Sequence, residues 1–333
     1  GLSGEVRTAV AAGDYQSAQK ALAQLQERYA RHSLTAEATR VYETRKLGEA
    51  TTEFTTFSDY KGNDRRIWDH AGSHAPGGNN WDILWAAGWD RIADDVDVSR
   101  INTQSIGLGY RDRWWSTRLW SSSFNGEGNH ANGLRWESTL YFRDYTSMTF
   151  AVGRRPLLDA QAWRNGAMGD SFRSVSCTHQ VGPRDTYTAG YEWSSYTDSN
   201  RYSSFTADYT HNVYITDKKT LSWFLFLNRS RYNFESDLYE SPAARVGYGG
   251  GFFHRWEIPK GYWSLTSALG WGYDKPDPTD FSPYFRLEYG HDFSAQRSLV
   301  IGLEYGFRTN RASGIKDLLF GYRQFDVRYN MLW

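Results

Sequence analysis

The last nine residues, Phe325-Asp326-Val327-Arg328-Tyr329-Asn330-Met331-Leu332-Trp333, carry the clearest structural signal in the chain. Apolar or aromatic side chains stand at every second position, and Asp326, Arg328, Asn330 and Leu332 stand between them. A period of two is typical of a β-strand, because successive side chains point to opposite faces. The segment therefore predicts a terminal strand with one apolar face and one largely polar face, ending on an aromatic residue.

The same alternation recurs through the chain from about Ala50 onward. The clearest predicted strands lie near 134–142, 187–193, 205–209, 245–252, 263–272, 285–289 and 299–308. Weaker runs lie near 50–59, 64–72, 80–90, 99–111, 113–124, 145–154, 171–182 and 219–231. With the terminal strand, these segments predict about sixteen antiparallel strands, an even number of the kind that bacterial barrels have.

Composition indicates where the apolar faces point. Aromatic residues make up 17% of the chain, with 15 Trp, 23 Tyr and 18 Phe, yet mean hydropathy is −0.68. A soluble β-sandwich or propeller is the alternative, but it would leave many of these large rings in exposed apolar patches. A high aromatic fraction and a low mean hydropathy are compatible if the side chains of each strand point alternately to lipid and to water. The excess of aromatic residues also suits the aromatic girdles at the two membrane interfaces of a barrel. We therefore predict an all-β fold, a transmembrane outer-membrane β-barrel over residues 49–333.

Residues 1–48 follow a different, helical period. Gly13, Tyr15 and Ala18, followed by Leu22 and Leu25, resemble the second half of a tetratricopeptide repeat. We expect helices over 4–11, 15–30 and 34–47. The alternative is a free amphipathic helical pair. Because a single repeat cannot bury its own face, and because Gly1 to Ala30 lacks a signal-peptide core, we expect the chain to be the C-terminal part of a longer precursor.

Several functional classes are disfavoured. Equal numbers of basic and acidic residues, 38 of each, argue against nucleic acid as a partner. The single cysteine, Cys177, cannot form an internal disulfide. Gly247-Tyr248-Gly249-Gly250-Gly251 lies within a strand pattern and is no phosphate loop, and His70 and His74 are separated by Gly72, so a helical metal pair is not expected. We predict no catalytic residue, no metal and no cofactor.

The polar face of each predicted strand gives the candidate lumen. The residues assigned to it are Arg135, Glu137, Glu192, Asp208, Arg245, Arg286, Glu288, Glu304, Arg308, Asp326 and Arg328. One interpretation is structural, because charges of opposite sign that lie two residues apart stiffen the wall. The other is functional, because these groups, together with Trp and Tyr rings, form a hydrogen-bonding and stacking track for a hydrated polymer.

Loop lengths predict orientation and a gate. Short turns such as 143–145 and 259–261 are expected at the periplasmic side, and the longer connections 155–169, 232–242 and 309–316 outside. A wide pore must be closed at rest, so we expect loops 61–78 and 155–169 to occlude it. In 155–169, Leu157, Leu158 and Trp163 are apolar anchors that can fold inward. The alternative is an ordinary surface loop.

Tetratricopeptide-like helices that lead into such a barrel resemble the outer-membrane exporters of biofilm exopolysaccharides. These include the Pel exporters of pseudomonads and the poly-β-1,6-N-acetylglucosamine export porins. The resemblance implies a bacterial outer-membrane barrel, a periplasmic helical scaffold that recruits a polysaccharide-modifying enzyme, and an outer-membrane lipoprotein ring. It also implies a cationic, partly deacetylated amino-sugar polymer as cargo. The predicted lumen is mixed in charge, so acidic polymers such as alginate stay open as an alternative.

Two other functions compete with export. A passive diffusion porin would share the barrel, but simple porins carry no periplasmic repeats. An outer-membrane lipid hydrolase or acyltransferase would need a Ser or His at the outer rim, and we find no such constellation.

Overall fold

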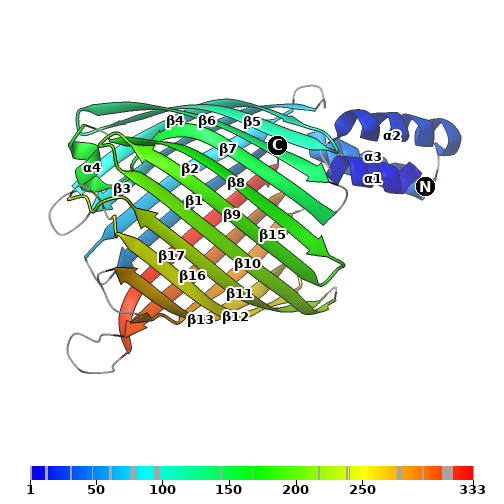
Figure 1. Ribbon diagram of the computed structural model, residues 1–333. Coiled ribbons are helices and arrows are strands. Elements are labelled where there is room, and N and C mark those ends of the chain that lie inside the picture. The colour runs from blue at the N-terminus through cyan, green and yellow to red at the C-terminus, as the bar shows by residue number, and fades with distance from the viewer. Residues whose placement is uncertain are drawn as a thin grey trace.

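The computed structural model describes residues 2–332 apart from 12–13, 31, 47, 60–61, 76–79, 94–97, 143–144, 167, 217, 238, 240, 276–279, 295 and 310–317. The side chains of 11, 33, 40, 44–46, 274–275, 280, 308–309 and 318–320 also fall outside the description, as does Trp333. Two parts are apparent, a helical segment and a barrel (Figure 1).

The helical segment consists of α1 (Leu2–Ala11), α2 (Tyr15–Tyr29) and α3 (Ser33–Lys46). The Asp14 carboxylate accepts a hydrogen bond from the Ser17 amide and so caps α2. The helices share a small core of Val6, Val10, Ala18, Ala21, Leu22, Leu25, Ala38 and Tyr42. No helix in the described part of the chain is both long enough and apolar enough to cross a bilayer.

The barrel follows from Glu49 onward. Its strands are β1 (Glu49–Asp59), β2 (Asp64–His74), β3 (Trp81–Ala93), β4 (Val98–Arg111), β5 (Trp115–Gly126), β6 (Asn129–Phe142), β7 (Thr146–Pro156), β8 (Gly169–Val181), β9 (Asp185–Tyr196), β10 (Arg201–Ile215), β11 (Lys219–Tyr232), β12 (Ala244–Ile258), β13 (Gly261–Lys275), β14 (Asp280–Phe281), β15 (Tyr284–Ser294), β16 (Arg297–Thr309) and β17 (Leu318–Leu332). A short helix, α4 (Ala160–Arg164), lies between β7 and β8.

The sheet closes on itself. Each strand pairs antiparallel with its neighbours in sequence, and β17 pairs with β1 from Glu49 opposite Leu332 to Asp59 opposite Tyr322. The two-residue β14 pairs with β13 in line with β15, so the seventeen labelled strands form a closed barrel of sixteen. The predicted barrel and its strand number are therefore confirmed.

The two ends of the barrel differ, and they are named here by what they carry. The helix end carries α1–α3 and mostly short turns, such as 182–184 and 259–260. The loop end carries α4 and the long connections 157–168 and 233–243 (Figure 1). The expectation that 61–78 forms an occluding loop is wrong, because residues 64–74 pair with β1 and β3 as strand β2.

Candidate functional site: the barrel lumen

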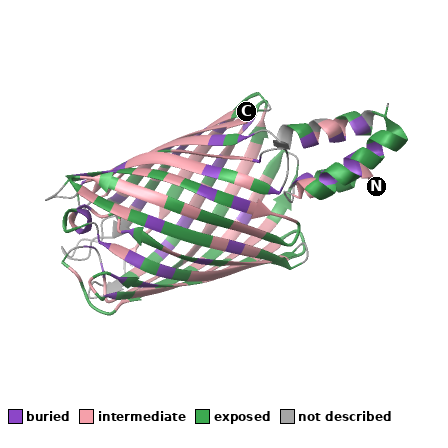
Figure 2. Cartoon of the chain, turned by 90° about the horizontal axis from the view of Figure 1, so that it is seen from above, coloured by how far each residue is buried: buried purple, intermediate pink, exposed green. Residues whose placement is uncertain are grey.

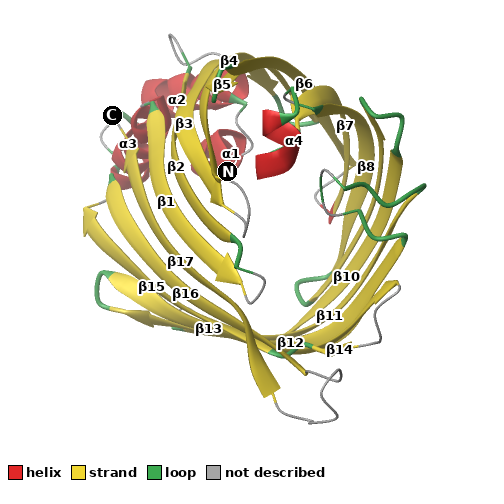
Figure 3. Cartoon of the chain, turned by 90° about the vertical axis from the view of Figure 1, so that its left-hand side faces the viewer, coloured by secondary structure: helices red, strands yellow, loops and turns green. Residues whose placement is uncertain are grey.

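The position of α4 identifies which strand face points inward. Seen from the loop end, α4 lies inside the ring of strands (Figure 3). The hydroxyl of Ser99 on β4 donates to the Ala160 carbonyl of α4 at 3.2 Å, so the Ser99 face is the lumen face. Strand pairing carries this assignment around the barrel, since directly opposed residues share a face. Exposed and more buried residues alternate along the strands accordingly (Figure 2).

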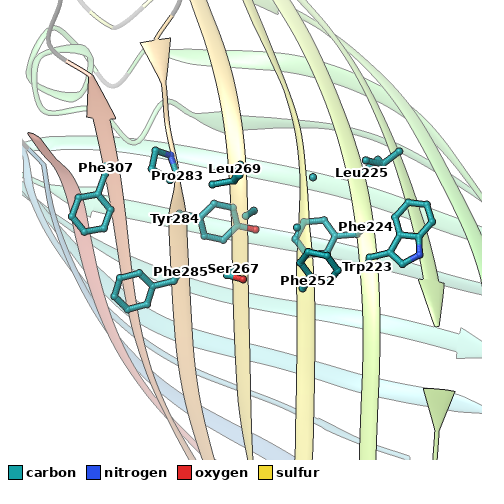
Figure 4. A pocket seen from close by; sticks show the side chains of 13 residues that line it. Trp223, Phe224, Leu225, Phe252, Ser267, Leu269, Pro283, Tyr284, Phe285 and Phe307 are labelled. Atoms are coloured by element: carbon teal, nitrogen blue, oxygen red, sulfur yellow. The ribbon is translucent and has the colours of Figure 1, made fainter. Parts of the chain in front are cut away.

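The outward face is apolar. Large exposed side chains on it include Ile106, Leu108, Leu119, Leu134, Trp136, Tyr191, Trp193, Phe205, Leu225, Leu227, Tyr248, Phe252, Leu269 and Leu303. Over β11–β16 this face has a groove of about 800 Å³ (Figure 4). Trp223, Leu225, Phe252, Phe285 and Phe307 line the groove together with the small residues Gly250 and Ser267, and the lining is almost wholly apolar. Such a surface matches a hydrocarbon environment.

The lumen face of β13–β17 holds a network centred on Arg286. Its guanidinium contacts both carboxylate oxygens of Asp326, at 2.8 and 2.9 Å, and Asp326 is almost completely buried. Arg286 also lies 3.3 Å from Glu288 and 3.4 Å from Glu304. Because one cation faces three carboxylates, the network leaves excess negative charge in this part of the wall.

Tyrosines and a second ion pair extend this network to the closing seam. Tyr262 donates to Glu288 at 2.7 Å, and Tyr322 donates to Glu304 at 2.6 Å. Across the seam, Arg328 on β17 binds both oxygens of Glu53 on β1 at 3.2 Å. Bidentate arginine–carboxylate pairs are geometrically demanding, so they fix the relative register of the first and last strands.

The opposite wall has its own charged groups. Arg135 pairs with Glu137 on β6, and Arg155 on β7 bridges Asp170 at 3.2 Å and Glu192 at 2.8 Å. The Arg155 guanidinium also lies over the Phe172 ring, 4.4 Å from its centroid. Asp208 projects into the lumen from β10 and has no ion-pair partner among the described residues.

Each predicted lumen residue can now be placed. The pairing register puts Arg135, Glu137, Glu192, Asp208, Arg245, Arg286, Glu288, Glu304, Asp326 and Arg328 on the lumen face. They do not form one cluster. Glu288, Glu304 and Asp326 meet around Arg286, Arg328 pairs with Glu53 at the seam, and Arg135, Glu137 and Glu192 lie on other strands. The side chain of Arg308 falls outside the described residues.

Sequence reasoning missed several charged lumen residues. They are Glu49, Glu53, Asp59, Arg65, Asp69, Asp82, Asp90, Arg111, Arg118, Arg155, Asp170, Arg255, Glu257 and Asp292. Many belong to strands recognised only as weak runs, whose faces were left unassigned. The alternating Trp81, Trp85 and Trp89 of β3 would have marked the outward face and so placed Asp82 and Asp90 inside.

The connection from β7 to β8 folds into the lumen at the loop end. Trp163 is completely buried and donates its indole N–H to the Gly126 carbonyl at 2.9 Å. Asn129 donates to the Trp163 carbonyl at 2.7 Å, which ties α4 to the β5–β6 turn. Of the other predicted anchors, Leu157 is partly buried, whereas Leu158 is 39% exposed. Trp163 is thus the principal anchor of this segment.

A second connection, 233–243, contacts the first through aromatic side chains. Tyr239 packs with Ala162, Met168 and Tyr196, and its ring stacks on that of Tyr196 with centroids 5.2 Å apart. The Tyr239 hydroxyl donates to Asp198 at 2.9 Å and accepts from the buried Asn200 amide at 3.0 Å. These contacts join both long connections to the wall.

Tyr239→Phe should weaken the attachment of connection 233–243 to the barrel wall by about 1–2 kcal/mol, because it leaves the buried Asn200 amide with one hydrogen-bond partner fewer. Burial raises the pKa of Tyr239 from 10 to about 12. The folded protein therefore favours the neutral phenol, and this contribution to the stability of the contact is fully present below pH 10. It is lost as the pH rises towards 12 and the phenol ionises. Limited proteolysis of 233–243 between pH 7 and pH 12 would measure both effects. Alkaline loosening that is equal in wild type and Tyr239→Phe would contradict the role of this phenol.

Comparisons place this barrel among known structures. No protein-family model matches the sequence, and no curated protein matches it. The structure is similar to one described as a bacterial polysaccharide outer membrane secretin, with a TM-score of 0.74 and 13% identity over 86% of this chain and 99% of that one. It is also similar to CdiB from Acinetobacter baumannii, with a TM-score of 0.56 and 10% identity over 85% of this chain and 60% of that one. At these identities the likeness establishes the fold, a β-barrel of the bacterial outer-membrane type.

Proposed function

We propose that the barrel is an outer-membrane pore that exports an exopolysaccharide, specifically a cationic, partly deacetylated amino-sugar polymer of the Pel kind. The observation that carries this proposal is the charge of the lumen wall. Its described carboxylates outnumber its arginines. The carboxylates are Glu49, Glu53, Asp59, Asp69, Asp82, Asp90, Glu137, Asp170, Glu192, Asp208, Glu257, Glu288, Asp292, Glu304 and Asp326, and the arginines are Arg65, Arg111, Arg118, Arg135, Arg155, Arg245, Arg255, Arg286 and Arg328.

An acidic lumen favours cations because the wall's field raises their local concentration and repels anions. The same field disfavours a polyuronate such as alginate. Lumen-facing rings such as Phe224 and Phe226, which lie opposite Gly251 and Gly249, add faces on which sugars can stack. The Tyr262 ring already carries the Arg255 guanidinium, and the Tyr322 ring already stacks on Phe57. The structural likeness to a polysaccharide secretin is consistent with this cargo.

The proposal includes an orientation and partners. The loop end faces the cell exterior and α1–α3 lie in the periplasm, because long loops mark the outer side of such barrels. There the tetratricopeptide-like helices recruit a polysaccharide-modifying enzyme, and a lipoprotein ring adjoins the helix end. Protease added to intact cells tests the orientation: cleavage within 233–243 is expected, and cleavage within α2 would contradict it.

Ion selectivity tests the lumen charge. The measurement is made in planar bilayers under a KCl gradient, on the small current of the intact barrel or on a barrel opened by Trp163→Ala. The reversal potential should show a preference for cations. Asp69→Asn with Asp208→Asn should reduce it, because neither carboxylate has an ion-pair partner among the described residues. Glu27→Gln, on an exposed position of α2, is the matched control and should change nothing. Anion preference in the wild type would contradict the proposal.

Oligosaccharide block tests the cargo. Partly deacetylated N-acetylhexosamine oligomers should interrupt the current at lower concentration than fully acetylated ones, and uronate oligomers should be weakest. Equal block by all three would remove the case for an amino-sugar polymer. A large steady conductance in the intact barrel, without saccharide block, would favour the alternative of a diffusion porin.

A further inference from the structure

The outward face of the barrel has an unequal distribution of charge. Arginines gather on this face in the strand segments nearest the loop end, and we call this set the arginine belt. It comprises Arg66, Arg91, Arg100, Arg154, Arg173, Arg201, Arg229, Arg231 and Arg323. On the described outward-facing strand positions, carboxylates occur only at Asp64 and Asp185, and Asp185 lies at the helix end.

Most of the belt lacks an internal counter-charge. Arg66 and Arg91 approach Asp64 at 3.4 and 3.3 Å, and Arg100 lies over the Trp89 ring. The other members on β7–β11 have no carboxylate partner among the residues that the structure describes; they are Arg154, Arg173, Arg201, Arg229 and Arg231. A patch of unpaired cations of this kind attracts an external anion.

The belt lies along the edge of the apolar surface. Leu227, two residues before Arg229 on the same face, is 40% exposed, and Val152, two residues before Arg154, is also 40% exposed. Each pair thus presents an alkyl group towards mid-barrel and a guanidinium towards the loop end. Cationic side chains next to a lipid-facing belt place their charge at headgroup level while their stems stay in the apolar layer.

A pocket lies within the arginine belt, on β9–β11. It has a volume of about 240 Å³ and is lined by Tyr191, Ser203, Phe205, Arg229 and Arg231 together with Ser204 and Ser230. In the strand register, Arg231 lies opposite Ser203 and Arg229 lies opposite Phe205. Two guanidinium groups and a hydroxyl therefore adjoin two exposed rings, a combination of phosphate donors with an apolar support.

From this arrangement we infer that the arginine belt binds phosphate-bearing membrane lipids, and that the Arg229–Arg231 pocket is a specific headgroup site. The lipid phosphate accepts hydrogen bonds from Arg229, Arg231 and the Ser203 hydroxyl, and its acyl chains lie along Phe205 and Leu227. Continuity of the cationic and apolar surfaces selects a lipid over a free anion. This inference is independent of the exported cargo.

The test uses the whole chain purified in a zwitterionic detergent. Native mass spectrometry would count retained lipid after titration with a phosphorylated glycolipid, and separately with the same lipid after removal of its phosphates. Arg229→Gln with Arg231→Gln should weaken binding of the phosphorylated lipid roughly 30-fold, since each basic group near a membrane surface contributes about fivefold. Arg229→Lys with Arg231→Lys should retain most of the binding.

Lys219→Gln with Arg297→Gln removes two charges from the same face at the helix end and is the control, expected to leave affinity unchanged. Heat-modifiable migration identifies the folded fraction of each variant, so binding is compared on folded barrel alone. Equal loss in the control, or equal binding of the dephosphorylated lipid, would overturn the inference. Full competition by inorganic phosphate would also overturn it, because the site would then be one for a free anion.

Discussion

Leu269→Arg is expected to destabilise the barrel by about 2–4 kcal/mol if this position lies near the bilayer midplane, because a guanidinium must then enter hydrocarbon. Leu269 lies near the centre of β13, faces outward, and is 53% exposed at the rim of the apolar groove. Urea unfolding in lipid vesicles, followed by tryptophan fluorescence, measures the change.

Gly272→Arg is the matched control on the same strand. Gly272 faces the lumen, and a Cβ added there would meet no atom within 4 Å. We expect a change in stability well below that of Leu269→Arg. Equal losses of unfolding free energy in Leu269→Arg and Gly272→Arg would contradict the assignment of the lipid-facing and lumen-facing sides of this strand.

Trp163→Ala is expected to release α4 from the lumen wall and to raise channel conductance severalfold. Truncation of a buried tryptophan typically costs about 3–5 kcal/mol. Here the indole also loses its hydrogen bond to Gly126, and α4 is only five residues long, so the cost should appear as local detachment rather than global unfolding. Planar-bilayer conductance and proteolysis of 157–168 would be recorded together.

Leu158→Ala serves as the control for this experiment, because Leu158 belongs to the same connection but is 39% exposed, whereas Trp163 is completely buried. It should leave both conductance and proteolysis near wild type. If α4 becomes cleavable in Trp163→Ala while conductance stays constant, the segment is attached to the wall without occluding the pore, and gating by this loop is ruled out.

Much of the barrel was predictable because strand periodicity is a local property. The alternation of Leu134, Trp136 and Leu140 with Arg135 and Glu137 indicates both the strand and its faces. Segment 64–74 was harder, since its outward face carries Asp64, Arg66 and His70 alongside Trp68. Because the two faces of this segment differ little in hydrophobicity, its pattern is also compatible with a loop. The segment forms a strand because it pairs with β1 and β3.

The site was less predictable, because its contacts join residues far apart in sequence. Arg286 and Glu288 are two positions apart and were recognised as a pair, whereas the bidentate contact of Arg286 with Asp326 depends on the register of β15, β16 and β17. Inward folding of 155–169 was expected from its apolar anchors, yet its contact with Tyr239 needs two connections to meet. The periodicity of a single strand contains no information on contacts between segments that are distant in sequence.

The seam between β1 and β17 has a consequence for the kinetics of folding. Arg328 and Glu53 are 275 positions apart, so the chain forms this contact only after searching a very large loop. Neighbouring strands close small loops first, and contacts of long sequence separation slow the folding of β proteins. Until the ends meet, the growing sheet carries two unsatisfied edges that can pair with other chains. Aggregation therefore competes with barrel formation at this last step, and any substitution that delays the seam increases the fraction lost.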